Sequence, residues 1–186
     1  DTIFSLLADL DPDNIDTLNQ VAEKVQEMIK TAVIPDDVQK AVGDGYSVLC
    51  KKCEIDALPV AVRSSATAED LPTASFAGQQ DTYLGITSAD RVIESVRKCW
   101  ASLYTPRAIS YRVKNDFPHE KVLISVGIQK MVNSRAAGVM FTLNPTDGDI
   151  SKVVIEGSWG LGETVVSGSV NPDKFVVDKV MGVINE

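Results

Sequence analysis

The chain has 186 residues, and its 18 Lys and Arg against 26 Asp and Glu give a net charge of −8 at pH 7. Apolar residues make up 44% and charged residues 24%, which excludes a disordered or low-complexity chain. The acidic balance disfavours a general nucleic-acid binder, which needs a basic surface. No apolar run approaches the roughly 20 residues of a membrane-spanning helix. We therefore expect neither nucleic acid nor a membrane as a partner.

The cysteine content and the two ends of the chain suggest its setting. Cys50, Cys53 and Cys99 are an odd and sparse set, and no signal sequence precedes them, which favours a reducing, cytoplasmic location. Cys50 and Cys53 form a CxxC pair without a second pair, so we expect ordinary helix residues rather than a zinc site. The chain lacks an initiator Met and stops in an apolar stretch. We expect a piece of a longer protein, truncated at both ends.

The first stretch, residues 1–57, is predicted to be helical. Apolar residues recur with a 3.6-residue period from Ile15 to Val33, after Asp13 or Asn14 as the cap. A second helix is expected to open at Pro35. No titratable cluster appears here, so we predict a pair of helices that serves packing.

The second stretch begins with a short β-branched run at 58–62, which predicts a buried strand. A long loop of small and hydroxyl residues is expected at 63–80, followed by a strand at 81–86. Thr87–Asp90 is typical of a capping box before a helix. Another helix is expected from Thr105 to about Lys114.

The third stretch is predicted to be built of strands. Alternating patterns and turn residues indicate four of them, at 122–129, 138–143, 152–158 and 174–178. Helices followed by a mostly antiparallel sheet predict an α+β fold.

The loop at 63–80 carries the most chemical information. Arg63 is expected at the end of a strand, where its planar guanidinium could make a bidentate contact with phosphate. Ser64, Ser65 and Thr67 add hydroxyl donors, and Gly78 permits close backbone approach. A phosphate site is one interpretation; a surface loop with Arg63 in a structural ion pair is the other. The loop matches neither a Walker A pattern nor GxGxxG.

Two further features have less specific interpretations. The glycine-rich segment Gly157–Glu163 follows a predicted strand, and it could approach a ligand or form a tight turn into a helix. His119 is the single histidine, and it lies in a polar turn. A lone histidine in such a turn is expected to be solvated, and a histidine-based nucleophile system has little support.

Several segments together carry a resemblance to a known family. They are Val60–Pro72 (VAVRSSATAEDLP), Ser75–Gln80 (SFAGQQ), Ala108–Arg112 (AISYR), Gly138–Thr142 (GVMFT), Trp159–Glu163 (WGLGE) and Val170–Asp173 (VNPD). In combination they resemble the N-terminal nucleotide-binding domain of the phosphoenolpyruvate synthase family. The same domain occurs in pyruvate phosphate dikinase, rifampicin phosphotransferase and phenylphosphate synthase. The similarity covers about residues 58–178, and residues 1–57 resemble the family only in pattern.

The resemblance implies a partial ATP-grasp-type fold over residues 58–186, in which two lobes close on ATP, after the helical segment at 1–57. It implies an enzyme that splits ATP to AMP and phosphate. The β-phosphoryl group would pass through a histidine on another domain to pyruvate, giving phosphoenolpyruvate. Arg63 would hold the phosphates and act in catalysis. By position, the resemblance assigns contacts with ATP to Arg63, Ser64, Ser65, Thr67, Gly78, Thr82, Gln129 and Met131.

The family pattern also includes a Gly-Gly-Lys segment, Mg²⁺-binding acidic positions and a phosphohistidine domain, which this sequence lacks. We therefore expect ATP and Mg²⁺ as cofactors, with the metal ligands outside this chain. The expected partners are the phosphohistidine and acceptor-binding domains, on the same chain or on partner subunits. This chain alone is expected to be inactive. Alternatives are a related phosphotransferase acting on phenol or rifampicin, a separate ATP-binding subunit, and a non-catalytic regulatory module of the same fold.

Overall fold

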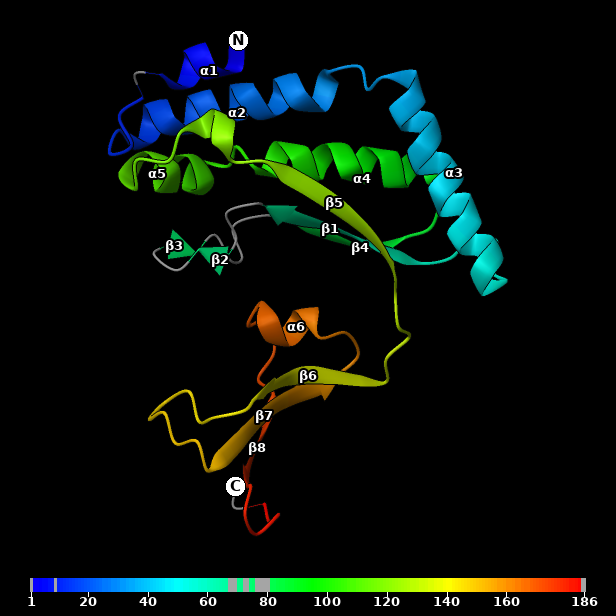
Figure 1. The fold of residues 1–186 in the computed structure, drawn as a ribbon, viewed down its shortest axis with the longest axis vertical. Coiled ribbons are helices and arrows are strands. Elements are labelled where there is room, and N and C mark those ends of the chain that lie inside the picture. The colour runs from blue at the N-terminus through cyan, green and yellow to red at the C-terminus, as the bar shows by residue number, and fades with distance from the viewer. Residues whose placement is uncertain (1, 9, 67–69, 72–73, 76–80, 185–186) are drawn as a thin grey trace. The chain divides into compact units, whose positions relative to one another are not determined.

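A computed structural model describes residues 2–8, 10–66, 70–71, 74–75 and 81–184 of the chain. It forms two compact units, Asp1–Met131 and Val132–Glu186 (Figure 1). Each unit combines helices with antiparallel strands, which confirms the α+β class.

The first unit contains, in chain order, α1 (Thr2–Leu7), α2 (Ile15–Thr31), α3 (Asp36–Cys53), β1 (Val60–Ala66), β2 (Asp70–Leu71), β3 (Ala74–Ser75), β4 (Thr82–Ile86), α4 (Ala89–Ser102), α5 (Pro106–Lys114), the 3₁₀ helix η1 (His119–Lys121) and β5 (Ile124–Lys130). Local side-chain caps explain where α2, α4 and α5 begin. The side chain of Asn14 accepts a backbone N–H from the first turn of α2, and Thr105 does the same for α5. The cap of α4 is Ser88, so the prediction of a box beginning at Thr87 was one residue off.

A three-stranded antiparallel sheet, in the order β4-β1-β5, forms the base of this unit. Strand β1 pairs with β5 along its whole length, from Val60 opposite Lys130 to Ala66 opposite Ile124. The prediction that the strand ends at Val62 and that a loop begins at Arg63 is therefore wrong. Pairing with β5 satisfies the backbone of this hydroxyl-rich segment and keeps it extended.

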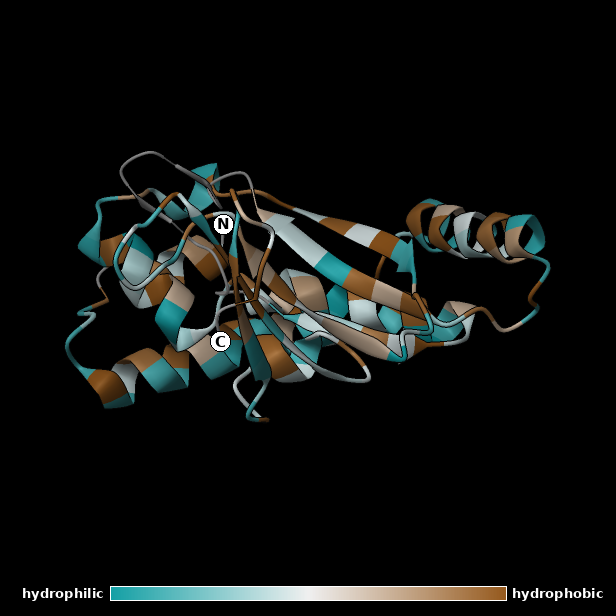
Figure 2. Cartoon of the chain, turned by 90° about the horizontal axis from the view of Figure 1, so that it is seen from below, coloured by the Kyte–Doolittle hydropathy of each residue, from teal (hydrophilic) through white to brown (hydrophobic). Residues whose placement is uncertain are grey.

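Helices α1, α2, α4 and α5 lie on one side of this sheet, and α3 runs down beside its end (Figure 1). Helix α4 packs directly on the three strands, α2 and α3 pack on α4, and α1 and α5 pack on α2. Hydrophobic and hydrophilic residues are interspersed along the helices (Figure 2). Apolar residues spaced about 3.6 positions apart gather on one side of a helix, which is the side that packs.

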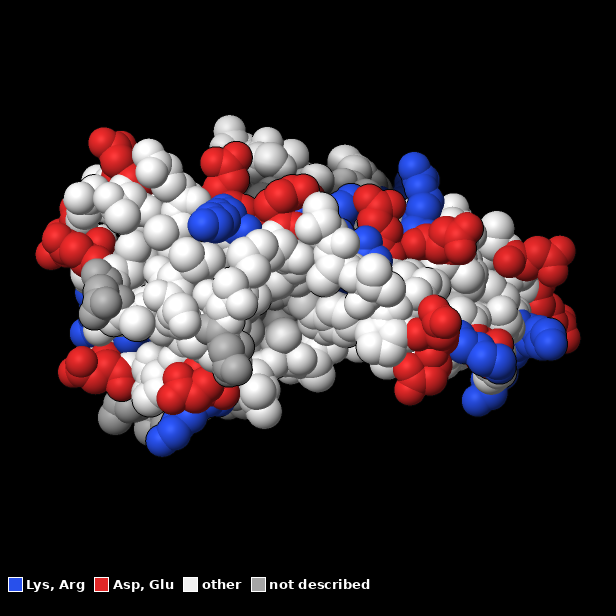
Figure 3. Space-filling model, turned by 90° about the horizontal axis from the view of Figure 1, so that it is seen from above, with Lys and Arg blue, Asp and Glu red and all other residues white. Residues whose placement is uncertain are grey.

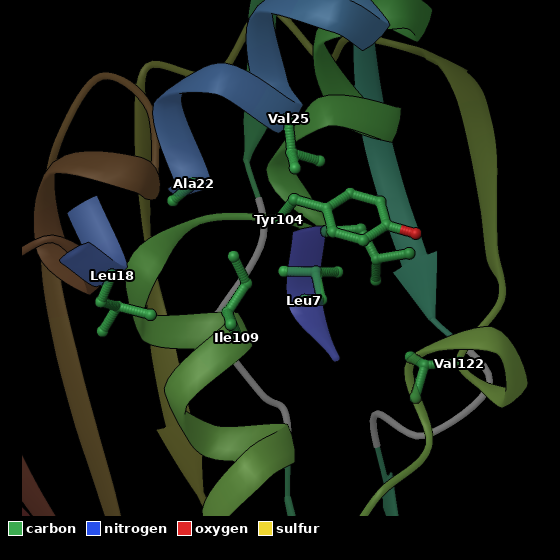
Figure 4. Packing of buried hydrophobic residues seen from close by; sticks show 8 residues of the cluster. Leu7, Leu18, Ala22, Val25, Tyr104, Ile109 and Val122 are labelled. Carbon is green, nitrogen blue, oxygen red and sulfur yellow. The ribbon is translucent and has the colours of Figure 1, made fainter. Parts of the chain in front are cut away.

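Two clusters of buried side chains make up the core. The first joins α1, α2 and α5, and Figure 4 shows Leu7, Val25, Tyr104 and Ile109 converging in it. The second lies between α3, α4 and the sheet, where Val60 and Val62 of β1 are fully buried, as are Val92 and Cys99 of α4. Cys50 and Cys53 lie on α3 without a disulfide, which confirms that they are helix residues.

The second unit contains, in chain order, β6 (Ala136–Phe141), β7 (Lys152–Trp159), α6 (Glu163–Val166) and β8 (Asp173–Asp178). Its strands form an antiparallel sheet in the order β6-β7-β8, as the alternating patterns predicted, and α6 packs on β6 and β7. Lys152 and Asp178 lie opposite each other on β7 and β8 and form an ion pair of 2.8 Å. Hydrogen bonding from Lys152 lowers the pKa of Asp178 to about 2.

The surface carries mixed charge. Acidic and basic side chains are interspersed on the face drawn in Figure 3. Among the described residues, no helix has both the length and the apolar content needed to cross a membrane.

Candidate functional site: one face of the β4-β1-β5 sheet

The strand register brings a set of polar residues onto one face of the first sheet. Residues directly opposite each other in an antiparallel sheet share a face, as do residues two apart along a strand. Arg63 lies opposite Thr82 on β4 and Gly127 on β5. On one side of Arg63, Ala61 lies opposite Gln129; on the other side, Ser65 lies opposite Ser125. We call this surface the Arg63 face; it consists of Ala61, Arg63, Ser65, Thr82, Ser125, Gly127 and Gln129.

The opposite face of the sheet is apolar and packs against the helices. Val60 and Val62 of β1 are fully buried, and Tyr83, Val126 and Ile128 pack against the same core cluster. The Arg63 face is exposed apart from Ala61. A rigid, buried backing of this kind holds exposed side chains in fixed positions, as a binding site requires.

Arg63 is the only cation on the Arg63 face. Its Nη1 donates a hydrogen bond to Oε1 of Gln129 at 3.4 Å. Among the residues that the structure describes, no carboxylate forms an ion pair with Arg63. Within the described part of the chain, most donors of the planar guanidinium therefore stay available for an anion.

Ser64 lies on the other face of β1, so the structure does not bring it to the predicted phosphate site. Its hydroxyl donates to the carbonyl oxygen of Asp81 at 3.2 Å, and the thiol of Cys99 donates to the same oxygen at 3.7 Å. Burial, aided by the charge of Asp81, raises the pKa of Cys99 to about 11, so this thiol stays protonated as a donor. These two contacts fix the backbone beside Thr82.

Met131 ties together the ends of two strands. Its backbone N–H donates to the carbonyl oxygen of Pro59 at 3.0 Å, and its sulfur accepts the N–H of Gly85 at 2.9 Å. Gly85 has φ of 70°, at the point where the pairing of β4 with β1 shifts register. Because the Met131 N–H is already used, a contact with ATP at this residue has to use another group, such as its carbonyl oxygen.

The other predicted site residues divide into two groups. Ser65, Thr82 and Gln129 lie on the Arg63 face, as does Arg63 itself. Thr67 and Gly78 lie outside the described residues. Ser125 and Gly127 belong to the face but were missed. The alternating pattern of 122–129, which places 125, 127 and 129 on one side, was the signal that could have found them.

The second glycine-rich segment forms a turn. The N–H of Gly160, at φ of 88°, donates to the carbonyl oxygen of Arg135 at 2.9 Å, and the hydroxyl of Ser134 donates to the Gly160 carbonyl at 2.8 Å. The guanidinium of Arg135 lies 5.3 Å from the centre of the Trp159 ring. These contacts favour the interpretation of a tight connection between β7 and α6.

His119 is not solvated as expected. It is half-buried, and its Nδ1 accepts a hydrogen bond from Nε of Arg112 at 2.9 Å. Burial and the neighbouring Arg112 charge lower its pKa. Its contacts are with α5 rather than with the Arg63 face. In the described parts of the chain, no group of three or more His, Cys, Asp or Glu side chains could hold a metal ion.

Comparison of the sequence with known proteins identifies the family of this chain. The chain is 54% identical over 181 residues to a probable phosphoenolpyruvate synthase of Staphylothermus marinus, covering 96% of the chain and 22% of that protein. It is 51% identical over 179 residues to a probable phosphoenolpyruvate synthase of Methanocaldococcus jannaschii, covering 96% of the chain and 15% of that protein. It is 47% identical over 179 residues to the phosphoenolpyruvate synthase of Pyrococcus furiosus, covering 96% of the chain and 22% of that protein.

The chain thus spans between 15% and 27% of the length of these and similar relatives. The family model for the AMP/ATP-binding domain of pyruvate phosphate dikinase matches it over residues 1–186. The expectation that residues 1–57 resemble the family only in pattern is therefore wrong, because the match includes them. The chain therefore belongs to the pyruvate phosphate dikinase AMP/ATP-binding domain family.

Proposed function

We propose that the Arg63 face binds the phosphates of ATP. The observation that carries this proposal is the exposed guanidinium of Arg63, without a carboxylate partner among the described residues, beside the hydroxyls of Ser65 and Thr82. A guanidinium can make bidentate contacts with phosphate oxygens, and neighbouring hydroxyls add donors to the same group. Gln129 orients the guanidinium through its side-chain oxygen.

We further propose that this is the ATP-binding part of a phosphoenolpyruvate synthase with an ATP-grasp-type fold. The helical segment 1–57 precedes that region at 58–186. In this proposal ATP is split to AMP and phosphate, and its β-phosphoryl group reaches pyruvate through a histidine on another domain. The names of the relatives support this assignment. The free thiols of Cys50, Cys53 and Cys99 support a cytoplasmic location.

The role of the chain is to bind and orient ATP and to stabilise charge on the transferred group. Phosphoryl transfer depends mainly on positioning and on cations near the phosphate oxygens. Arg63 would supply such a cation. The described residues include no group of three or more His, Cys, Asp or Glu side chains that could hold Mg²⁺. We propose that its ligands, and the phosphate-binding lysine, lie outside this chain, so that the chain alone is inactive.

The test is Arg63→Ala in the full-length protein, measured by calorimetric titration with ATP. Loss of a charge-assisted hydrogen bond costs about 1.5–3 kcal/mol, so the affinity should fall about tenfold to a hundredfold. Pyruvate-dependent formation of AMP should fall with it. Arg107→Ala is the matched control, because Arg107 is an exposed arginine on α5. Unchanged ATP affinity in Arg63→Ala would refute the proposed site.

A further inference from the structure

Arg112, on α5, is a fully buried cation with unsatisfied hydrogen-bond donors. It is 0% exposed, the largest of the fully buried side chains in the described part of the chain. Its Nε donates to Nδ1 of His119 at 2.9 Å, and its guanidinium carbon lies 5.2 Å from the centre of the Tyr104 ring. Nη1 and Nη2 are both buried, and neither has a hydrogen-bond partner among the described residues. Of the roughly five N–H donors of a guanidinium, only the one on Nε therefore has a partner among the described residues.

The charge of this group needs a partner. Burial lowers the pKa of Arg112 to about 10, so it is still protonated at pH 7. A buried charge without a counter-ion is strongly unfavourable, and its two free Nη groups would each lose the hydrogen bonds that water gives them. Among the described ion pairs none involves Arg112. The aromatic face of Tyr104 offsets the charge but accepts no conventional hydrogen bond.

A pocket of about 490 Å³ adjoins this side chain, within the first compact unit. Its volume lies in the range of small-molecule sites. The lining contains the polar side chains of Arg112 and His119 and two acidic residues. The rest of it is mainly apolar, chiefly Leu7, Leu10, Val113 and Phe117. Both Nη atoms are closed off from solvent, so a group that pairs with them has to displace side chains of the lining as it enters the pocket.

We propose that this pocket receives a carboxylate that pairs with Nη1 and Nη2 of Arg112. The two adjacent Nη donors match the two oxygens of a carboxylate. Asp116 and Glu120 also line the pocket and are exposed. Their negative charges disfavour a dianion such as phosphate more strongly than a monoanion. The apolar walls suit the hydrocarbon part of a carboxylic acid or of an acidic side chain.

The carboxylate can come from two sources with the same chemistry. One is a free small carboxylate. The other is an Asp or Glu of the full-length protein. It can lie beyond this chain, which spans only 15% to 27% of the length of its relatives, or it can be Asp9, which follows the lining residue Ala8 in the sequence and lies outside the described residues. Either source completes the same bidentate pair, and the experiment separates the two.

The experiment titrates His119 in the full-length protein by NMR, with the His119→Gln variant used to assign its ring signal. Burial of the ring and the charge of Arg112 lower the pKa of His119, whereas the charge of Glu120 raises it. Asp116 is the other acidic residue that lines the same pocket. A carboxylate bound to Arg112 offsets the cation, so the pKa of His119 should rise. Sodium butyrate is the probe, at constant ionic strength against sodium chloride, with sodium phosphate in parallel. Arg112→Met, an apolar residue of similar length, is the control.

A saturable rise with butyrate that is absent in Arg112→Met supports the proposal with a free carboxylate. A rise that persists in Arg112→Met, or an equal or larger rise with phosphate, overturns it. If butyrate has no effect, a crystal structure of the full-length protein decides. A carboxylate oxygen of the protein within hydrogen-bond distance of Nη1 or Nη2 supports the proposal with an internal source. Water or backbone carbonyls alone at both atoms overturn it.

Discussion

Neighbouring residues on β1 have different tasks, because side chains alternate between the faces of a strand. Ser64 points to the helix side and holds the carbonyl oxygen of Asp81, whereas Ser65 lies on the Arg63 face opposite Ser125. Both residues are serines, so a prediction that places them in a loop cannot assign them to different faces of a strand. The strand register supplies that distinction.

This pair gives a prediction at the residue scale. Ser65→Ala in the full-length protein should weaken ATP binding about twofold to tenfold, the effect of one hydrogen bond of about 0.5–1.5 kcal/mol. Ser64→Ala should leave ATP affinity unchanged and lower the melting temperature slightly, because it removes the bond to Asp81. Calorimetric titration and thermal unfolding measure the two effects. Equal loss of ATP affinity in both variants would contradict the assigned faces.

At the scale of the elements, β6 and β7 approach each other unusually closely at one point. Gly138 and Gly157 lie directly opposite each other in the register. A Cβ at Gly138 would lie 2.1 Å from the carbonyl oxygen of Glu156 and 2.8 Å from Cα of Gly157. A Cβ at Gly157 would meet its nearest atom, the Ala137 carbonyl oxygen, at an ordinary 3.6 Å. The two glycines are therefore not equivalent.

We predict that Gly138→Ala loosens the β6-β7 pair, because a backbone neighbour cannot move aside as a flexible side chain could. Overpacking of this kind costs about 1–3 kcal/mol. Hydrogen exchange of the β6 and β7 amides in the full-length protein should quicken accordingly. Gly157→Ala is the matched control and should exchange like the wild type or more slowly. Equal exchange rates in the two variants would contradict the prediction, because they would show that the close contact at Gly138 does not affect the stability of the β6-β7 pair.

The sequence predicted the helices better than the extent of the strands. Asn14 and Thr105 are local caps, and each begins a helix where the residue type indicates. The continuation of β1 through Ala66 was missed because hydroxyl residues are typical of loops as well as of solvent-facing strands. What keeps this segment extended is β5, about 60 residues further along the chain. Local propensity carries no information on such a distant partner.

At the scale of the whole molecule, the proposed site belongs to the first compact unit and needs a rigid sheet behind it. Arg63, Thr82 and Gln129 come from three strands, and α4 packs on all three. The family resemblance predicted these three residues, and the register explains how they meet. The contact between Arg112 and His119 escaped prediction, because a lone histidine in a polar turn gives no sign of a buried neighbour.

The most direct test of the account is a crystal structure of the full-length protein with Mg²⁺ and a non-hydrolysable ATP analogue. We predict phosphate oxygens within hydrogen-bond distance of the Arg63 guanidinium, with the hydroxyls of Ser65 and Thr82 near the same phosphates and Ser64 still bonded to Asp81. A well-ordered nucleotide bound away from the Arg63 face, with the Arg63 guanidinium making no contact with phosphate, would contradict it.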